Sequence, residues 1–251
     1  NNNDEIYHVN LIEKILATVL AKMSNFIPEG GIWMNTQRPE WNDANNALVG
    51  NGVSMVTLYY LRRFLNFFKD VLAHVGTEKF AVSEEIADFF NRLASTLKAN
   101  QHLLSGRIDD KNRKRVLDGL AQAGSDYRDQ IYTHAFSGRK KVITAADIKD
   151  FVAVGLEYLE HSIKTNKRAD NLYHAYNLMT ANGDSISIAH LAEMLEGQVA
   201  ALSSKYLSYG EVLSVLDAMK QSRLFRPDQY SYLLYPKKEL KGFLDRNKIS
   251  G

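Results

Sequence analysis

Apolar residues recur with the period of an α-helix along most of this chain. From residue 12 to residue 27 they keep to one face, and Pro28 with the two glycines after Glu29 ends that helix. Residues 53–75 are apolar on almost every side, which predicts a helix buried between its neighbours. Later segments with the same period predict further helices, several of them opened by a capping residue: 83–97 after Ser83, 110–135, 144–163 after Thr144, 187–203, a short helix opened by Ser208 and Glu211, and a last one that ends near Asn247.

Three long segments lack a helical period: residues 32–51, 166–186 and 224–236. Loops of such length are uncommon unless they have a function. No segment alternates for long enough to require a sheet, although residues 230–235 suit either state. The sequence therefore predicts an all-α fold of antiparallel helical hairpins, with about eight helices in a single domain over residues 1–251.

Composition excludes several classes of function. Lys and Arg outnumber Asp and Glu by 31 to 29, and a net charge of +2 is too small to favour nucleic acid or a membrane as partner. The chain has no cysteine, which excludes disulfides, thiol nucleophiles and cysteine-ligated zinc. No apolar run reaches the roughly 18 residues of a membrane span, and residues 1–5 lack the pattern of a signal peptide. The sequence does not indicate a compartment.

The segment from Asn35 to Asn46 is dense in groups that bind and cleave sugars. Carboxylates can protonate a leaving oxygen, asparagine amides both donate to and accept from hydroxyls, and an indole offers an apolar face to a sugar ring. Both tryptophans of the chain, Trp33 and Trp41, lie in or beside this segment. The alternative is a capping loop, because Asp and Asn are also the natural residues of turns.

The run from Pro39 to Asn46, with Glu-Trp-Asn-Asp-Ala-Asn between them and Gly50-Asn51-Gly52 soon after, resembles the Trp-Asn-Asp motif of cellobiose-phosphorylase-like enzymes. These enzymes belong to the six-hairpin, (α/α)6-toroid glycosidases. Residues 172–178 are similar to a loop at the mouth of such a toroid. The resemblance extends loosely from residue 10 onward. It implies a ring of helical hairpins, an active site where the loops gather, and Asp43 as the proton donor.

Two departures from that family's pattern matter. The chain lacks a loop rich in Thr, Ser and Gly that would hold phosphate, which favours hydrolysis or a lyase-like reaction over phosphorolysis. A full toroid also contains more helices than the pattern supplies. We therefore expect these residues to be the C-terminal part of a longer (α/α)6 catalytic domain. The rest of that domain, or an oligomer partner, would then cover an exposed apolar flank.

The candidate site residues fall into two roles. The candidate catalytic carboxylates are Asp43, Glu40 and Glu196, and the candidate substrate-binding residues are Trp41, Asn42, Asn45, Asn46, Asp170, Tyr173, His174 and Tyr176. Asp43 is preferred to Glu40 as the acid, because neighbouring amides can orient it and a partly enclosed site can raise its pKa, whereas Pro39 favours an exposed start to the segment. The simpler alternatives are that residues 168–177 pack their tyrosines on the core and that Glu196 lies on a solvated helix flank.

Other chemistries find little support in the sequence. The basic runs 111–115 and 139–141 are short and flanked by acids, so a solvated face is expected. The histidines never fall at metal-binding spacing, so neither a metal nor a cofactor is expected. The leading hypothesis is a glycosidase, a hydrolase of carbohydrate metabolism that cleaves an oligo- or polysaccharide by acid–base chemistry. The competing classes are a non-catalytic module that binds carbohydrate or protein, and a helical nucleic-acid-associated protein that uses residues 111–115.

Overall fold

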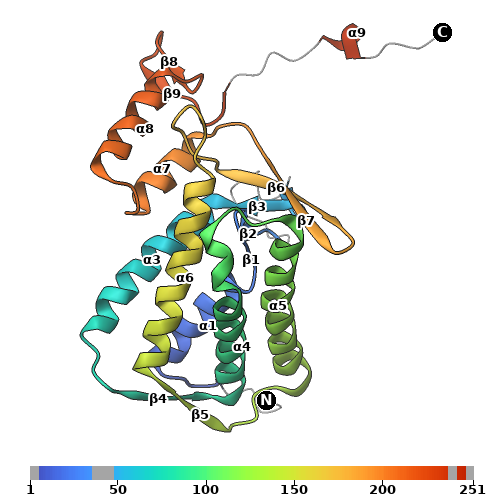
Figure 1. The fold of residues 1–251 in the computed structure, drawn as a ribbon, viewed down its shortest axis with the longest axis vertical. Helices are drawn as coiled ribbons and strands as arrows, with labels where there is room; N and C mark the ends of the chain where they lie inside the picture. The colour runs from blue at the N-terminus through green and yellow to red at the C-terminus, as the bar shows by residue number, and fades with distance from the viewer. Residues whose placement is uncertain (1–5, 36–47, 237–241, 247–251) are drawn as a thin grey trace, which may run out of the picture.

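A computed structural model describes residues 6–35, 48–236 and 242–246 (Figure 1). Most of the predicted helices are present. They are α1 (Leu11–Met23), α3 (Met55–Ala73), α4 (Glu84–Asn100), α5 (Asp110–Asp129), α6 (Ala145–Thr165), α7 (Leu195–Ser203), α8 (Tyr209–Gln221) and α9 (Phe243–Arg246), with the 3₁₀ turn η1 (Gln101–Ser105) and the π turn η2 (Gln130–His134).

Two of the predicted helix starts are confirmed in atomic detail. The hydroxyl of Thr144 accepts from the backbone of Asp147, whose carboxylate accepts in return from the backbone of Thr144. Ser208 and Glu211 form the same reciprocal capping box at the start of α8. Each box satisfies backbone N–H groups that the first turn would otherwise leave without partners.

The prediction of an all-α toroid of helical hairpins is wrong, because the chain contains a five-stranded antiparallel sheet. Its strand order is β1-β2-β3-β6-β7, and two further sheets of two strands are β4-β5 and β8-β9. The strands are β1 (Phe26–Ile27), β2 (Gly31–Trp33), β3 (Gly52–Ser54), β4 (Lys79–Ser83), β5 (Lys140–Thr144), β6 (Tyr176–Asn182), β7 (Ser185–His190), β8 (Phe225–Arg226) and β9 (Ser231–Tyr232). The fold is therefore mixed α and β.

The hairpin of β6 and β7 replaces part of a predicted loop and part of a predicted helix over 187–203. Its register pairs Asn182 with Ser185 across a two-residue turn, and Gly183 takes φ +57 at the first turn position. A glycine adopts this backbone readily. Residues 185–190 alternate Ser, Ile, Ser, Ile, Ala, His, so one face of β7 is apolar, and the helix α7 begins only at Leu195.

The first three strands occupy residues that the periodicity assigned to a helix end and a loop. Phe26 and Ile27 are fully buried as strand β1 rather than as the last turn of α1. Gly31 takes φ +125, and a side chain there would lie 2.7 Å from the carbonyl oxygen of Ser54. Only glycine allows β2 to approach β3 this closely.

The helix α5 packs against β1 and β7 of the five-stranded sheet, and α3 packs against β2 and β6. The main hydrophobic core joins α1, α3, α4 and α6. A smaller core under α5 contains Ile27, Val53, Leu117 and Ile186. The sheet therefore separates two packed layers, which decides which side chains can share a site.

The surface of α3 carries a row of exposed apolar side chains at helical spacing: Tyr60, Phe64, Phe67 and Val71. In the part of the chain that the structure describes, no helix is both long and apolar enough to cross a bilayer.

Candidate functional site

The predicted carboxylate loop lies between β2 and β3. Residues 36–47 are outside the described part of the chain, and with them the predicted site residues Glu40, Trp41, Asn42, Asp43, Asn45 and Asn46. The residues that close this loop are described. We call them the loop neck: Trp33, Met34, Gly50 and Gly52.

The loop neck is held by a ladder of short hydrogen bonds. Met34 donates its backbone N–H to Gly52 and accepts from the N–H of Gly50, at 2.9 and 2.7 Å. The indole of Trp33 donates to the carbonyl of Gly50 at 3.0 Å. A side chain at Gly52 would meet the carbonyl oxygen of Leu48 at 2.7 Å, so the second glycine of Gly50-Asn51-Gly52 is needed for this closure.

Of the four predicted substrate-binding residues in 170–176, three are buried. Tyr173 is almost fully buried and packs edge-on against Tyr59, with ring centroids 6.4 Å apart. His174 stacks on His190, with centroids 4.0 Å apart and the rings nearly parallel. Asp170 pairs with Arg168 at 2.8 Å in a partly exposed turn. Tyr173 therefore packs on the core, as the simpler alternative for this segment predicts.

The structure brings two of the predicted residues together. The hydroxyl of Tyr176 lies 3.1 Å from Oε2 of Glu196, in the first turn of α7. Glu196 is half-buried rather than fully solvated. Successive residues of a strand point to opposite faces, so Tyr176 and Glu196 lie across the sheet from the side chain of Asn177.

A cavity of about 770 Å³ opens at the α5 face of the sheet, and we call it the His190 cavity. Its volume is within the range of small-molecule sites. Its lining combines hydroxyl, guanidinium, ammonium and carboxylate groups: Glu29, Arg107, Ile108, Asp109, Asp110, Lys111, Arg113, Thr165, Ser185, Ser187, Ile188 and His190. None of these residues is among the predicted catalytic or substrate-binding residues.

A buried ion pair shapes one wall of the His190 cavity. Nη2 of Arg113 lies 2.8 Å from Oε2 of Glu29, and both side chains are about 95% buried, with exposed fractions of 6% and 5%. Burial raises the pKa of the Glu29 carboxyl, but hydrogen bonds from His161, Ile108 and Arg113 outweigh burial and bring the pKa below its usual value. Glu29 is therefore ionised at neutral pH and cannot serve as a general acid.

Two buried asparagines connect this ion pair to His190. Asn166 donates its amide to the carbonyls of Glu29 and Ser162, both at 2.8 Å, so its side-chain oxygen must accept. It accepts from the amide of Asn177 at 2.9 Å, and that amide also donates to the carbonyl of Gly30 at 2.7 Å. The oxygen of Asn177 is therefore the atom that faces the histidine.

This chain of hydrogen bonds selects the tautomer of His190. Its Nδ1 lies 2.8 Å from the oxygen of Asn177, which can only accept, so Nδ1 carries the proton. Burial and the positive charges of Arg107 and Arg168 lower the pKa of His190. The ring is therefore neutral near pH 7, and Nε2 is left as a hydrogen-bond acceptor or a general base.

Strand register places His190 and the loop neck in one row across the sheet. Trp33 pairs with Val53, Val53 with Asn177, and Asn177 with His190. Paired residues of an antiparallel sheet project from the same face, and three strand spacings amount to about 14 Å. The His190 cavity and the loop neck thus share the α5 face.

The basic runs are largely paired with acids. Lys111 pairs with Asp184 and Lys114 with Asp118 on the surface, whereas Arg113 is buried in the ion pair with Glu29. A solvated face thus describes most of residues 111–115 but not Arg113. The sequence signal for the burial of Arg113 is its position on the apolar side of α5, beside Val116 and Leu117.

Comparison of the chain with protein-family models and with curated proteins finds no match. Among the described residues, no group of three or more His, Asp or Glu side chains has the arrangement of a metal site.

Proposed function

We propose that this chain is a carbohydrate-active enzyme that cleaves a glycosidic bond of an oligo- or polysaccharide, with Asp43 as the proton donor. The resemblance of residues 39–46 to a glycosidase motif supports the assignment of Asp43. The observation that carries the proposal is the row that connects His190 to Trp33 at the loop neck. Because of this row, the sugar-sized cavity and the neck of the carboxylate loop lie on the same face of one rigid sheet.

The His190 cavity has the chemistry that a sugar requires. Sugar hydroxyls both donate and accept, and the cavity presents hydroxyls at Thr165, Ser185 and Ser187, an acceptor at Nε2 of His190 and a donor at Arg107. In this proposal these groups bind and orient a sugar ring, and the loop supplies the proton. Glu40, in the same loop, is the candidate for the second carboxylate. Glu196, which the hydroxyl of Tyr176 contacts, lies across the sheet from the His190 cavity and cannot act there.

A second candidate function is a non-catalytic module that binds carbohydrate. It is favoured by the state of the carboxylates in the His190 cavity. Glu29 and Asp110 are paired with Arg113, and the oxygens of Asp109 cap α5. A general acid needs a raised pKa, whereas backbone N–H groups lower the pKa of Asp109. If the loop supplies no acid, the cavity would still bind sugar without cleaving it.

Calorimetric titration with a panel of neutral and acidic oligosaccharides tests the proposed site. We expect at least one to bind, and His190→Gln to weaken that affinity by about tenfold, the usual effect of one lost hydrogen bond in a closed site. His8→Gln, at an exposed position, is the matched control and should leave the affinity unchanged. Equal affinities for wild type and His190→Gln would show that sugar binds elsewhere. Absence of binding across the panel would refute both candidate functions.

A further inference from the structure

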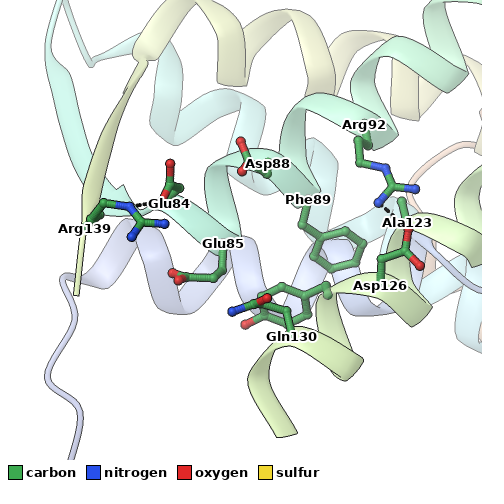
Figure 2. A pocket seen from close by; sticks show the side chains of 10 residues that line it. Glu84, Glu85, Asp88, Phe89, Arg92, Ala123, Asp126, Gln130 and Arg139 are labelled. Atoms are coloured by element: carbon green, nitrogen blue, oxygen red, sulfur yellow. Dashed lines mark hydrogen bonds and ion pairs between the residues drawn. The ribbon is translucent and has the colours of Figure 1, made fainter. Parts of the chain in front are cut away.

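A second cavity, of about 310 Å³, lies between α4 and α5, and we call it the α4–α5 cavity (Figure 2). Its lining residues come mainly from these two helices: Glu84, Glu85, Asp88, Phe89, Arg92, Ala123, Asp126, Tyr127, Gln130 and Arg139. Four of the side chains are carboxylates and two are guanidinium groups, and Lys141 pairs with Glu84 and Asp88, so one negative charge is in excess. That excess favours a cationic ligand.

Three of the four carboxylates already have cationic partners: Glu84 with Arg139, Asp88 with Lys141 at 2.7 Å, and Asp126 with Arg92 at 2.6 Å. Figure 2 shows the Glu84 and Asp126 pairs at opposite ends of the cavity, with Glu85 between them. The fourth carboxylate, Glu85, is therefore the one that can pair with a cationic ligand.

Glu85 is 92% buried, and only one of its two oxygens is engaged. Oε1 accepts from the backbone N–H of Ser137 at 2.7 Å. Oε2 is buried and has no hydrogen-bond partner in the part of the chain that the structure describes. A buried carboxylate oxygen without a donor is unfavourable, and Glu85 is one of the residues that line the cavity, so a donor bound there would satisfy it.

The state of Glu85 strengthens this conclusion. Burial raises the pKa of its carboxyl, but hydrogen bonds from Ser137 outweigh burial and leave the pKa below its usual value. The side chain is therefore ionised at neutral pH. An ionised oxygen needs a stronger donor than a neutral one does, and a charged donor gives the shorter and stronger bond.

Aromatic rings form an apolar wall beside Glu85. Phe89 and Tyr127 stack with centroids 4.8 Å apart and an interplanar angle of 12°. Burial and the charges of Glu13 and Glu85 raise the pKa of the Tyr127 hydroxyl to about 12. The region thus combines negative potential with ring faces, which suits an alkyl chain that ends in a cation.

We propose that the α4–α5 cavity binds a primary alkylammonium group, whose nitrogen donates to Oε2 of Glu85 and whose alkyl chain packs against Phe89. A single available oxygen matches an ammonium, which acts as a point charge. A guanidinium instead prefers to engage both oxygens of a carboxylate. Because the described residues form no metal-binding group, the expected cation is organic.

Two sources supply this chemistry: a free alkylamine and the lysine side chain of a peptide or protein. The probes are therefore pentylammonium chloride and the tripeptide acetyl-Ala-Lys-Ala-amide, each titrated into the chain and followed by NMR. Pentanol and acetyl-Ala-Arg-Ala-amide test the need for charge and the preference for ammonium. We expect binding by at least one ammonium probe, no binding by pentanol and weaker binding by the arginine peptide. Stronger binding of the lysine peptide would identify a protein partner, and stronger binding of pentylammonium a small amine.

Glu85→Gln should weaken ammonium binding by about tenfold or more, because it removes the charge that makes the hydrogen bond strong. Asp118→Asn is the matched control, because that carboxylate lies on α5 outside the cavity lining and pairs with Lys114, and it should change the affinity less than about twofold. If Glu85→Gln does not fold, the proposal is tested in the wild type by magnetisation transfer between the pentyl chain and the Phe89 ring. Absence of binding by both ammonium probes, binding unaffected by Glu85→Gln, or no transfer to Phe89 would overturn the proposal.

Discussion

Asn177 and His190 face each other across β6 and β7, and the side-chain oxygen of Asn177 lies 2.8 Å from Nδ1 of His190. The orientation of Asn177 is itself set by Asn166, which is bonded to the backbone of Glu29. A buried polar chain therefore runs from the β1–β2 turn to the His190 cavity. Its members, Glu29, Asn166, Asn177 and His190, come from separate segments of the chain and are joined only by the fold.

The buried ion pair of Glu29 and Arg113 should be necessary for stability. Arg113→Met leaves an ionised carboxylate buried, and we expect it to lower the free energy of unfolding by about 3 kcal/mol. Lys114→Met removes an exposed pair with Asp118 and should cost no more than about 0.5 kcal/mol. Urea unfolding of both variants measures the difference. Similar midpoints and slopes for the two would contradict the role of Arg113.

His174 should make the protein less stable in mild acid. Burial, His190 and Arg168 lower the pKa of His174 to about 4 from the ordinary 6.5. Below pH 6.5 the unfolded chain therefore binds a proton at this histidine that the folded chain does not bind until the pH approaches 4. The free energy of unfolding falls as the pH falls from 6.5 toward 4. Between about pH 7 and about pH 5 the loss should be about 2 kcal/mol.

The variant His174→Phe isolates that effect, because it keeps an aromatic ring against His190 and removes the titrating group. Its free energy of unfolding should change less between the two pH values than that of the wild type. The lowered pKa of His190 accounts for the slope that remains. His8→Phe, at an exposed position, should keep the full slope. An unaltered slope in His174→Phe would place the titrating group elsewhere.

Closure of the loop neck should depend on Gly52. A methyl group there would meet the carbonyl oxygen of Leu48 at 2.7 Å, so Gly52→Ala should cost about 2 kcal/mol as the β2–β3 hairpin shifts. Gly76→Ala adds the same methyl group where nothing lies within 4 Å and should be neutral or stabilising by about 0.5 kcal/mol. Chemical denaturation compares them, and equal effects would argue against a tight neck.

The helices could be predicted because their signals are local. The capping boxes at Thr144 and Ser208 and the apolar faces of α4 and α6 depend on residues three or four positions apart. The sheet was missed because β1, β2 and β3 are two or three residues long, too short to show a period of two. The alternation of residues 185–190 after Asn182-Gly183 is a usable hairpin signal, but the predicted boundary between a loop and a helix at residue 187 divides it.

The site could be predicted only in part. Two of the predicted residues, Tyr176 and Glu196, lie within hydrogen-bond distance of each other, but on the face of the sheet opposite the His190 cavity. The Glu29–Arg113 pair and the Asn177–His190 contact could not be selected. They join residues that are 84 and 13 positions apart, and these residues meet only because of a sheet whose short strands carry little signal in the sequence. Glu29 in particular lies in a turn, with φ +60, and only the fold shows that its side chain is buried.

The release of reducing ends from an oligosaccharide panel tests the central claim most directly, with wild type, Asp43→Asn and Glu40→Gln compared side by side. We expect the wild type to cleave at least one substrate. Asp43→Asn keeps shape and hydrogen bonding but cannot donate a proton, so its turnover should fall by roughly 10²–10⁴, and Glu40→Gln should lose less. Near-normal turnover in Asp43→Asn beside an inactive Glu40→Gln, or no cleavage of any substrate by the wild type, would contradict the account.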